Sequence, residues 1–116
     1  MFSLNESNIF MVYSHCVDLR KGVEPLCGIA RNGGRKPSDG CVYVFLNRSR
    51  TLMKLLHWER GGYVIYYKRM EAGRISRKVF RCQQKAGFYA LRWDELVLFV
   101  EGVSPSASRR KRFNIQ

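Results

Sequence analysis

The sequence predicts an α+β domain in which an antiparallel β-meander packs with one longer N-terminal helix and one short C-terminal helix. Three observations support this prediction. Strand-length runs of aromatic and β-branched residues follow one another at 41–46, 52–58 and 63–70, with short turn sequences between them. An amphipathic stretch with helical spacing precedes these runs, and a shorter one follows them. The chain has 116 residues, 46% of them hydrophobic, which fits one folded domain.

The N-terminal part is expected to hold a strand and the longer helix. Residues 9–14 are rich in β-branched and aromatic types and are too few for a helix, so they predict a strand. From Asp18 onward, apolar residues recur at helical spacing until Asn32-Gly33-Gly34 ends the pattern. Pro25 interrupts this stretch, because a proline in a helix interior removes a backbone hydrogen bond. The helix is therefore either kinked or begins nearer Val23.

The central meander is predicted from its turns. Pro37-Ser38-Asp39-Gly40 leads into the first run, residues 47–50 form the next loop, and Arg60-Gly61-Gly62 forms a tight turn. Short turns between successive strands require an antiparallel arrangement. Since both faces of these runs carry apolar residues, we expect the sheet to be covered on each side.

The pattern is weaker toward the C-terminus. Residues 77–82 and 88–91 predict two short strands, and Asp94 caps or opens a short helix that ends near Gly102. We expect residues 1–103 to form the single domain. Residues 104–116 are expected to form a flexible basic tail, because small polar residues are followed there by four consecutive cations.

Positive charge is concentrated in one part of the chain. The formal net charge is +12, and residues 48–85 hold 11 of the 21 Lys and Arg residues but only two of the nine Asp and Glu residues. A field of this sign attracts polyanions, of which nucleic acid is the commonest inside cells. The alternatives are an acidic protein partner and a surface whose charge only keeps the protein soluble.

Basic residues alternate with aromatic ones in this stretch. Cations neutralise phosphates, and aromatic faces stack on unpaired bases. Tyr66 and Tyr67 point to opposite faces of a strand, so at least one is expected in the core. Arg48 and Arg50 lie in a loop and are expected to be exposed, as part of a continuous basic surface along the hairpins. The candidate binding residues are Arg20, Lys21, Arg48, Arg50, Lys54, Arg60, Lys68, Arg69, Arg109, Arg110, Lys111 and Arg112.

The sequence contains no recognisable catalytic apparatus. Its carboxylates are scattered, and Asp18, Asp39 and Asp94 suit helix starts or a turn. There is no phosphate loop with Walker spacing, and no Ser or Cys has an identifiable base partner. The four cysteines and two histidines complete no zinc pattern, so buried, reduced thiols are expected. We expect no enzymatic activity, metal or cofactor; the alternative is a metal-dependent nuclease without a sequence signature.

The sequence also bears on location. The N-terminus lacks the features of a signal peptide, and no run approaches the ~20 apolar residues of a membrane span. Free thiols are typical of a reducing compartment. We therefore expect a cytoplasmic protein with no membrane contact and no small-molecule substrate.

Short motifs follow one another in a fixed order along most of the chain. They include Asp18-Leu19-Arg20-Lys21-Gly22, Pro37-Ser38-Asp39-Gly40, Val44-Phe45-Leu46-Asn47-Arg48-Ser49-Arg50, Lys54-Leu55-Leu56-His57-Trp58 and Tyr66-Tyr67-Lys68-Arg69-Met70-Glu71-Ala72-Gly73. Over residues 9–103 this series resembles the TnpB-type accessory protein of the insertion-sequence sixty-six family. The order is specific, whereas each motif alone would be weak. Pro25 departs from the family pattern.

The resemblance implies a second small gene product, encoded beside a transposase and needed for efficient transposition. In such elements the transposase is a separate, larger chain that holds the catalytic carboxylates. The implied partners are DNA, expected at the element ends, and the transposase. The alternative is an adaptor that binds the transposase without contacting DNA. The polar positions that match the family are Asp18, Arg20, Lys21, Asn47, Arg48, Arg50, Lys54, Lys68, Arg69 and Glu71.

Overall fold

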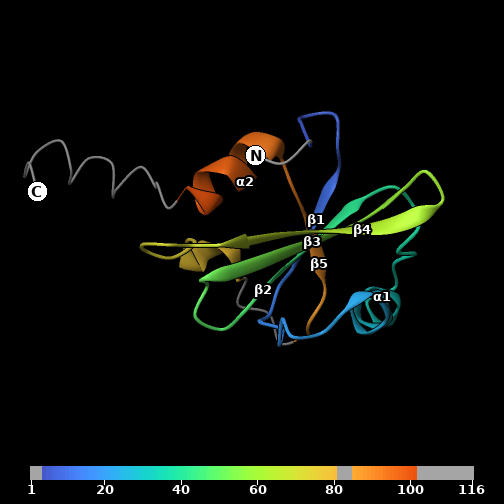
Figure 1. Cartoon of the computed structure of the whole chain (residues 1–116), viewed down its shortest axis with the longest axis horizontal. Coiled ribbons are helices and arrows are strands. Elements are labelled where there is room, and N and C mark those ends of the chain that lie inside the picture. The colour runs from blue at the N-terminus through green and yellow to red at the C-terminus, as the bar shows by residue number, and fades with distance from the viewer. Residues whose placement is uncertain (1–3, 81–84, 102–116) are drawn as a thin grey trace, which may run out of the picture.

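A five-stranded sheet with the strand order β4-β3-β2-β1-β5 organises the chain in a computed structural model (Figure 1). The structure describes residues 4–80 and 85–101. The elements are, in chain order, β1 (Phe10–Tyr13), α1 (Val23–Asn32), β2 (Val42–Leu46), β3 (Leu52–Glu59), β4 (Gly62–Arg69), the 3₁₀ turn η1 (Arg77–Val79), β5 (Phe88–Leu91) and α2 (Trp93–Val100).

The sheet is mixed rather than purely antiparallel. β2, β3 and β4 form the expected meander, and β5 runs antiparallel to β1, but β1 runs parallel to β2. α1 makes the crossover that a parallel pair requires. The α+β fold is thus confirmed, whereas the prediction of a purely antiparallel meander is wrong. The longer helix, α1, follows β1, and its 10 residues exceed the eight of α2 by little.

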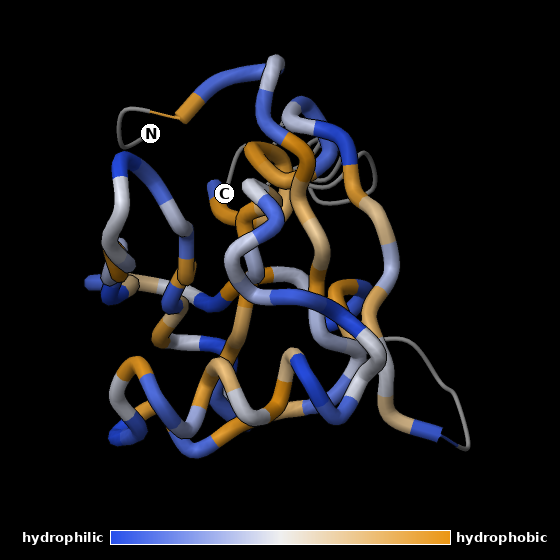
Figure 2. Tube along the Cα trace, turned by 90° about the vertical axis from the view of Figure 1, so that its right-hand side faces the viewer, coloured by the Kyte–Doolittle hydropathy of each residue, from blue (hydrophilic) through white to orange (hydrophobic). Residues whose placement is uncertain are grey.

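The two helices cover opposite faces of the sheet, as Figure 1 shows. On the face covered by α2, Val44 and Leu55 pack in one buried cluster with Leu96 of that helix. On the face covered by α1, Phe45 and Leu26 belong to a second buried cluster. Figure 2 shows hydrophobic residues concentrated along the central strands and hydrophilic ones at the turns. Coverage of the sheet on both sides, expected from the sequence, is confirmed.

The start of α1 resolves the difficulty raised by proline. Because α1 begins at Val23, Pro25 is its third residue and lies in the first turn. The N–H groups of a first turn have no partner within the helix, so proline costs no hydrogen bond there. After the helix, a Cβ atom on Gly33 would lie 2.9 Å from ring carbons of Phe88. Glycine therefore lets the end of α1 approach β5 closely.

A network of polar side chains fixes the turn before β2. The Tyr43 hydroxyl donates to Asp39 Oδ2 at 2.7 Å, and the Cys41 N–H donates to Asp39 Oδ1 at 2.9 Å. Burial, reinforced by the hydrogen bond to Asp39, raises the pKa of Tyr43. Burial alone would raise the pKa of Asp39, but the hydrogen bonds from Tyr43 and Cys41 outweigh it and lower that pKa. Asp39 thus has the turn-forming role that its sequence position indicated.

The C-terminal expectations have mixed outcomes. β5 and α2 are confirmed at 88–91 and 93–100, but Asp94 lies within the first turn of α2, whose N-cap is Arg92. The strand predicted at 77–82 is wrong for residues 77–80, because the Ser76 hydroxyl accepts a hydrogen bond from the Lys78 N–H and stabilises a 3₁₀ turn at 77–79. Gly102 and the expected tail at 104–116 lie outside the described residues.

The prediction that the cysteines are buried, reduced thiols has a mixed outcome. Cys27 and Cys41 are free and buried, as predicted, but Cys16 is exposed in the loop that follows β1, so the prediction of burial is wrong for that thiol. Cys82 lies outside the described residues.

In the described part of the chain, neither helix has the length and apolar character needed to cross a membrane.

Candidate nucleic-acid interface

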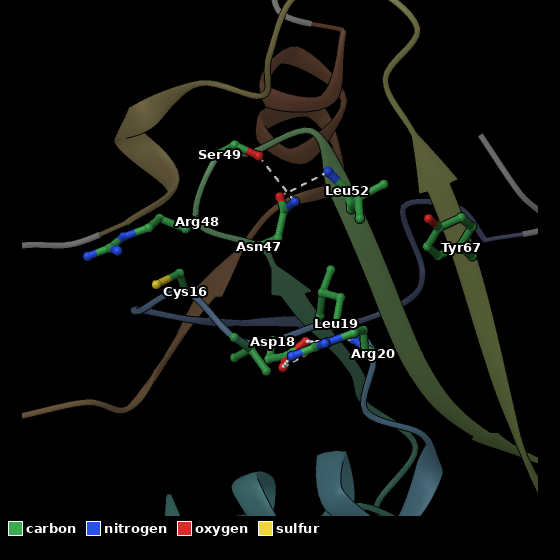
Figure 3. Close-up of a pocket in the computed structure, with 10 residues that line it drawn as sticks. Cys16, Asp18, Leu19, Arg20, Asn47, Arg48, Ser49, Leu52 and Tyr67 are labelled. Carbon is green, nitrogen blue, oxygen red and sulfur yellow. Dashed lines mark hydrogen bonds and ion pairs between the residues drawn. The ribbon is translucent and has the colours of Figure 1, made fainter.

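A groove of about 670 Å³ opens at the corner of the sheet where β2 ends and β3 begins (Figure 3). Its residues come from the loop before α1, the turn between β2 and β3, the start of β3, and β4. They are Cys16, Val17, Asp18, Leu19, Arg20, Asn47, Arg48, Ser49, Leu52 and Tyr67. We call this the corner groove. Val17, Leu19 and Leu52 also belong to the α1-side core or pack against it, so the groove lies on the face covered by α1.

Asn47 shapes the turn that carries Arg48. Its Oδ1 atom accepts hydrogen bonds from the N–H groups of Thr51 and Leu52, both at 3.0 Å, and its Nδ2 group donates to the Ser49 hydroxyl at 3.2 Å. These bonds hold the turn from within. Arg48 is exposed, and Figure 3 shows its side chain pointing outward, away from Tyr67. The turn therefore presents the Arg48 guanidinium to solvent at the groove rim.

The loop before α1 forms the opposite side of the groove. The Val17 N–H donates to the Leu46 carbonyl oxygen at 2.8 Å, which fixes the loop against the end of β2. Arg20 Nη2 lies 2.7 Å from Asp18 Oδ2. Hydrogen bonds from Arg20 hold the pKa of Asp18 well below its usual range. Part of the positive charge of Arg20 is thus balanced by its neighbour.

Tyr67 is the exposed aromatic residue of the groove. It is 51% exposed, and Lys54 Nζ lies 5.9 Å from its ring centroid. The same ammonium donates to the Lys21 carbonyl oxygen at 3.0 Å, linking β3 to the loop before α1. Arg69, two residues after Tyr67 on the same face of β4, pairs with Leu52 and is exposed. Tyr66 packs against the core on the other face, so the prediction that one of the two tyrosines is core is confirmed.

The structure gathers five of the predicted binding residues at the corner groove or its rim. These are Arg20, Lys21, Arg48, Lys54 and Arg69. Lys68 faces the α2 side of the sheet, and Arg60 lies in the turn at the far end of the β3–β4 hairpin. The four tail residues, Arg109, Arg110, Lys111 and Arg112, lie outside the described residues. Among the residues that the structure describes, the candidate cations therefore do not form one continuous surface along both hairpins.

Arg50 is less exposed than its loop position predicted. It was expected to be exposed with Arg48, but it is half-buried, and its Nη1 group donates to the Ile75 carbonyl oxygen at 3.1 Å. Sequence reasoning also did not identify Leu19 and Leu52 as groove residues or Asn47 as the residue that organises the turn. The position of Asn47 just after a strand was the available signal for that role.

The described residues show no cluster suited to a metal ion. Within residues 4–80 and 85–101, no three His, Cys, Asp or Glu side chains are placed to hold a metal ion. His57 is buried in β3, where its Nδ1 atom lies 3.4 Å from the Cys41 carbonyl oxygen. The absence of enzymatic activity stays a prediction.

Arg60 provides a test of where the candidate interface ends. Arg60 and Gly61 have φ angles of 52° and 82°, which is the backbone of a turn that favours Asn-Gly. Arg60→Asn is expected to raise the free energy of unfolding by about 0.5 kcal/mol, because asparagine adopts this conformation at lower cost. Eight-residue β3 separates Arg60 from the corner groove. That distance is about 25 Å, so DNA affinity should change less than 2-fold, or about 0.4 kcal/mol.

Urea unfolding and a DNA-binding titration on the same Arg60→Asn preparation check both expectations. A fall in affinity well beyond 2-fold would extend the candidate interface to the far end of the hairpin.

A family model described as "IS66 Orf2 like protein" matches residues 8–110, which include every strand, both helices and all residues of the corner groove. Neither a curated protein nor a solved structure matches the chain significantly.

Proposed function

Because the chain belongs to the IS66 Orf2-like family, as its motifs indicated, we propose that it is a non-catalytic accessory factor of transposition that binds DNA at the corner groove. The family match supports the transposition-associated role. The observation that carries the DNA-binding part is the exposed ring of Tyr67, set between an apolar groove and a rim of cations. Such a combination is typical of sites that hold unpaired nucleotides.

The charges of the groove are available to an external anion. Among the described residues, Arg20 is the one groove cation that forms an ion pair, with Asp18. Lys21, Arg48, Lys54 and Arg69 have no carboxylate partner in that part of the chain. Neutralising phosphates with such side chains releases counterions and drives association. A phosphate backbone therefore fits the rim better than a neutral ligand.

The apolar interior favours single-stranded or locally opened DNA. Leu52 and Leu19 line the groove beside Tyr67, and a flat base can stack on the tyrosine ring while its phosphates meet the rim. In a closed duplex the base faces are already stacked, so they are not free for such contact. We therefore expect an unpaired base to occupy the groove.

A salt-titrated binding assay tests the proposal. Fluorescence anisotropy is measured with a labelled single-stranded oligonucleotide and with the matching duplex, each over a range of NaCl concentrations. The four unpaired cations of the groove and its rim contribute about −3 to the log–log slope for the single strand. Flat salt dependence, or absence of binding, would exclude the DNA-binding role. Co-purification with transposase after nuclease treatment, without DNA binding, would establish the adaptor instead.

Tyr67 separates stacking from charge. Tyr67→Ala is expected to lower affinity for single-stranded DNA by about 10-fold, since stacking on an aromatic ring contributes about 1–3 kcal/mol per base. Tyr67→Phe keeps the ring and should keep the affinity. Duplex affinity should change little in either variant. An equal loss for single and double strands in Tyr67→Ala would show that the ring does not stack on a base.

A further inference from the structure

Three arginines are brought together on the other side of the turn between β2 and β3. The Ile75 N–H donates to the Arg50 carbonyl oxygen at 2.9 Å, and Arg50 Nη1 donates back to the Ile75 carbonyl oxygen at 3.1 Å. This reciprocal pair of bonds fixes the segment after β4 against the turn. It places Arg74, the neighbour of Ile75, and Arg77, the first residue of η1, beside Arg50. We call these three residues the arginine cluster.

The cluster lacks internal charge compensation. No Asp or Glu of the described residues lies within ion-pair distance of these three guanidinium groups. Burial, and then the charges of Arg77 and Arg74, lower the pKa of Arg50, although a guanidinium stays charged at neutral pH. Like charges held together raise the energy of the folded state until an anion joins them.

The backbone conformation of Arg50 also indicates that its side chain has a role of its own. Its φ angle is 62°, a left-handed conformation that costs an arginine about 1 kcal/mol and that glycine or asparagine adopts more readily. The turn itself therefore gives no reason for an arginine. The side chain instead anchors residues 74–77 and adds a third positive charge to theirs.

We propose that Arg50, Arg74 and Arg77 form a phosphate-binding site, and that DNA lying in the corner groove crosses the turn between β2 and β3 to reach it. Planar guanidinium groups bind phosphate oxygens in a bidentate manner, which suits three of them to one phosphodiester group. The second part of the proposal rests on the proposed function. Arg48, Ser49 and Asn47 of this turn line the corner groove, and Arg50 of the same turn belongs to the cluster.

The first experiment does not depend on DNA. Inorganic phosphate is titrated into the ¹⁵N-labelled protein at constant ionic strength, and the arginine Nε–Hε signals are followed by NMR. Saturable shifts are expected for Arg50, Arg74 and Arg77, and a linear, small response for Arg31. In the double variant Arg74→Gln/Arg77→Gln the Arg50 shift should be lost. Uniform small shifts of all arginine signals in the wild type would overturn the phosphate site.

The second experiment asks whether the DNA strand reaches the cluster. Arg74→Gln/Arg77→Gln should reduce the magnitude of the salt slope for single-stranded DNA by about 0.7, because the cluster holds one phosphate and each phosphate contact contributes about 0.7. The control variant Arg31→Gln/Lys36→Gln removes the same charge from exposed positions at the end of α1 and should leave the slope unchanged.

The two experiments fail separately. If the wild type binds phosphate at the cluster but no DNA, the proposed function is wrong and the phosphate site stands. If it binds DNA with the same slope in the cluster variant and the wild type, the path across the turn is wrong. If the slope falls equally in the cluster variant and the control, the effect is one of net charge, and the path is again wrong.

Discussion

Arg48→Glu combined with Arg69→Glu is expected to lower the affinity for single-stranded DNA by about 100-fold near 0.1 M salt. Both side chains are exposed at the rim of the corner groove, and neither has an ion-pair partner among the described residues. The reversal removes two phosphate contacts and replaces them with repulsion. It should also flatten the salt dependence, because fewer counterions are released on binding.

A second charge reversal controls for total charge. Arg31→Glu/Lys36→Glu changes the net charge by the same amount, from exposed positions at the end of α1. Anisotropy titrations should give a loss of less than 5-fold for this pair, about 1 kcal/mol, because distant surface charges are screened. Circular dichroism and thermal unfolding verify the fold of both proteins. Equal losses for the two pairs would show that DNA binding depends on the net charge of the molecule and not on the corner groove.

Phe45→Ala is expected to cost about 3–5 kcal/mol of the free energy of unfolding. Phe45 is completely buried in β2, and its ring centroid lies 6.0 Å from that of Tyr13 and 5.9 Å from that of Phe88. Truncation leaves a cavity between three strands and α1 that the surrounding side chains fill only in part. For a domain at the lower end of the usual range of about 5–15 kcal/mol, this loss removes most of the free energy of unfolding.

Urea unfolding of Phe45→Ala beside Leu98→Ala measures the effect. Leu98 is 45% exposed on α2, so its truncation should cost less than about 1 kcal/mol. A cost for Phe45→Ala as small as that for Leu98→Ala would contradict the tightly packed core on the α1 side. Phe45→Leu, which keeps most of the volume, should recover much of the lost stability.

The sequence predicted the elements whose causes are local. The meander of β2, β3 and β4 follows from turn residues such as Gly61, and the end of α1 follows from Gly33 and Gly34. The parallel pairing of β1 with β2 was missed, because four residues of a strand do not specify a partner 32 positions later. The 3₁₀ turn η1 was also missed, since the hydroxyl of Ser76 competes with strand pairing through a local hydrogen bond.

The sequence likewise predicted the features of the candidate site that depend on local structure, but not those that depend on tertiary packing. The loop position of Arg48 correctly indicated exposure, whereas the same reasoning failed for Arg50, whose partner Ile75 is 25 residues away. Alternation placed Tyr66 and Tyr67 on opposite faces, but it does not tell which face α1 leaves uncovered. That choice is made by tertiary packing. Grouping the cations at one corner likewise depended on the sheet register.

The position of β1 within the sheet has a consequence for how the chain is synthesised. β1 is made first, yet its neighbours are β2, from Val42, and β5, from Phe88. During translation, β1 cannot pair until β2 and β5 have been synthesised. The contacts that bury β1 are distant in sequence, so they close long loops and form slowly. Translation that terminates before Phe88 would release a product that lacks β5, so β1 would become an edge strand with unpaired N–H and C=O groups. Exposed edge strands promote aggregation, so premature termination should yield insoluble fragments rather than a smaller functional protein.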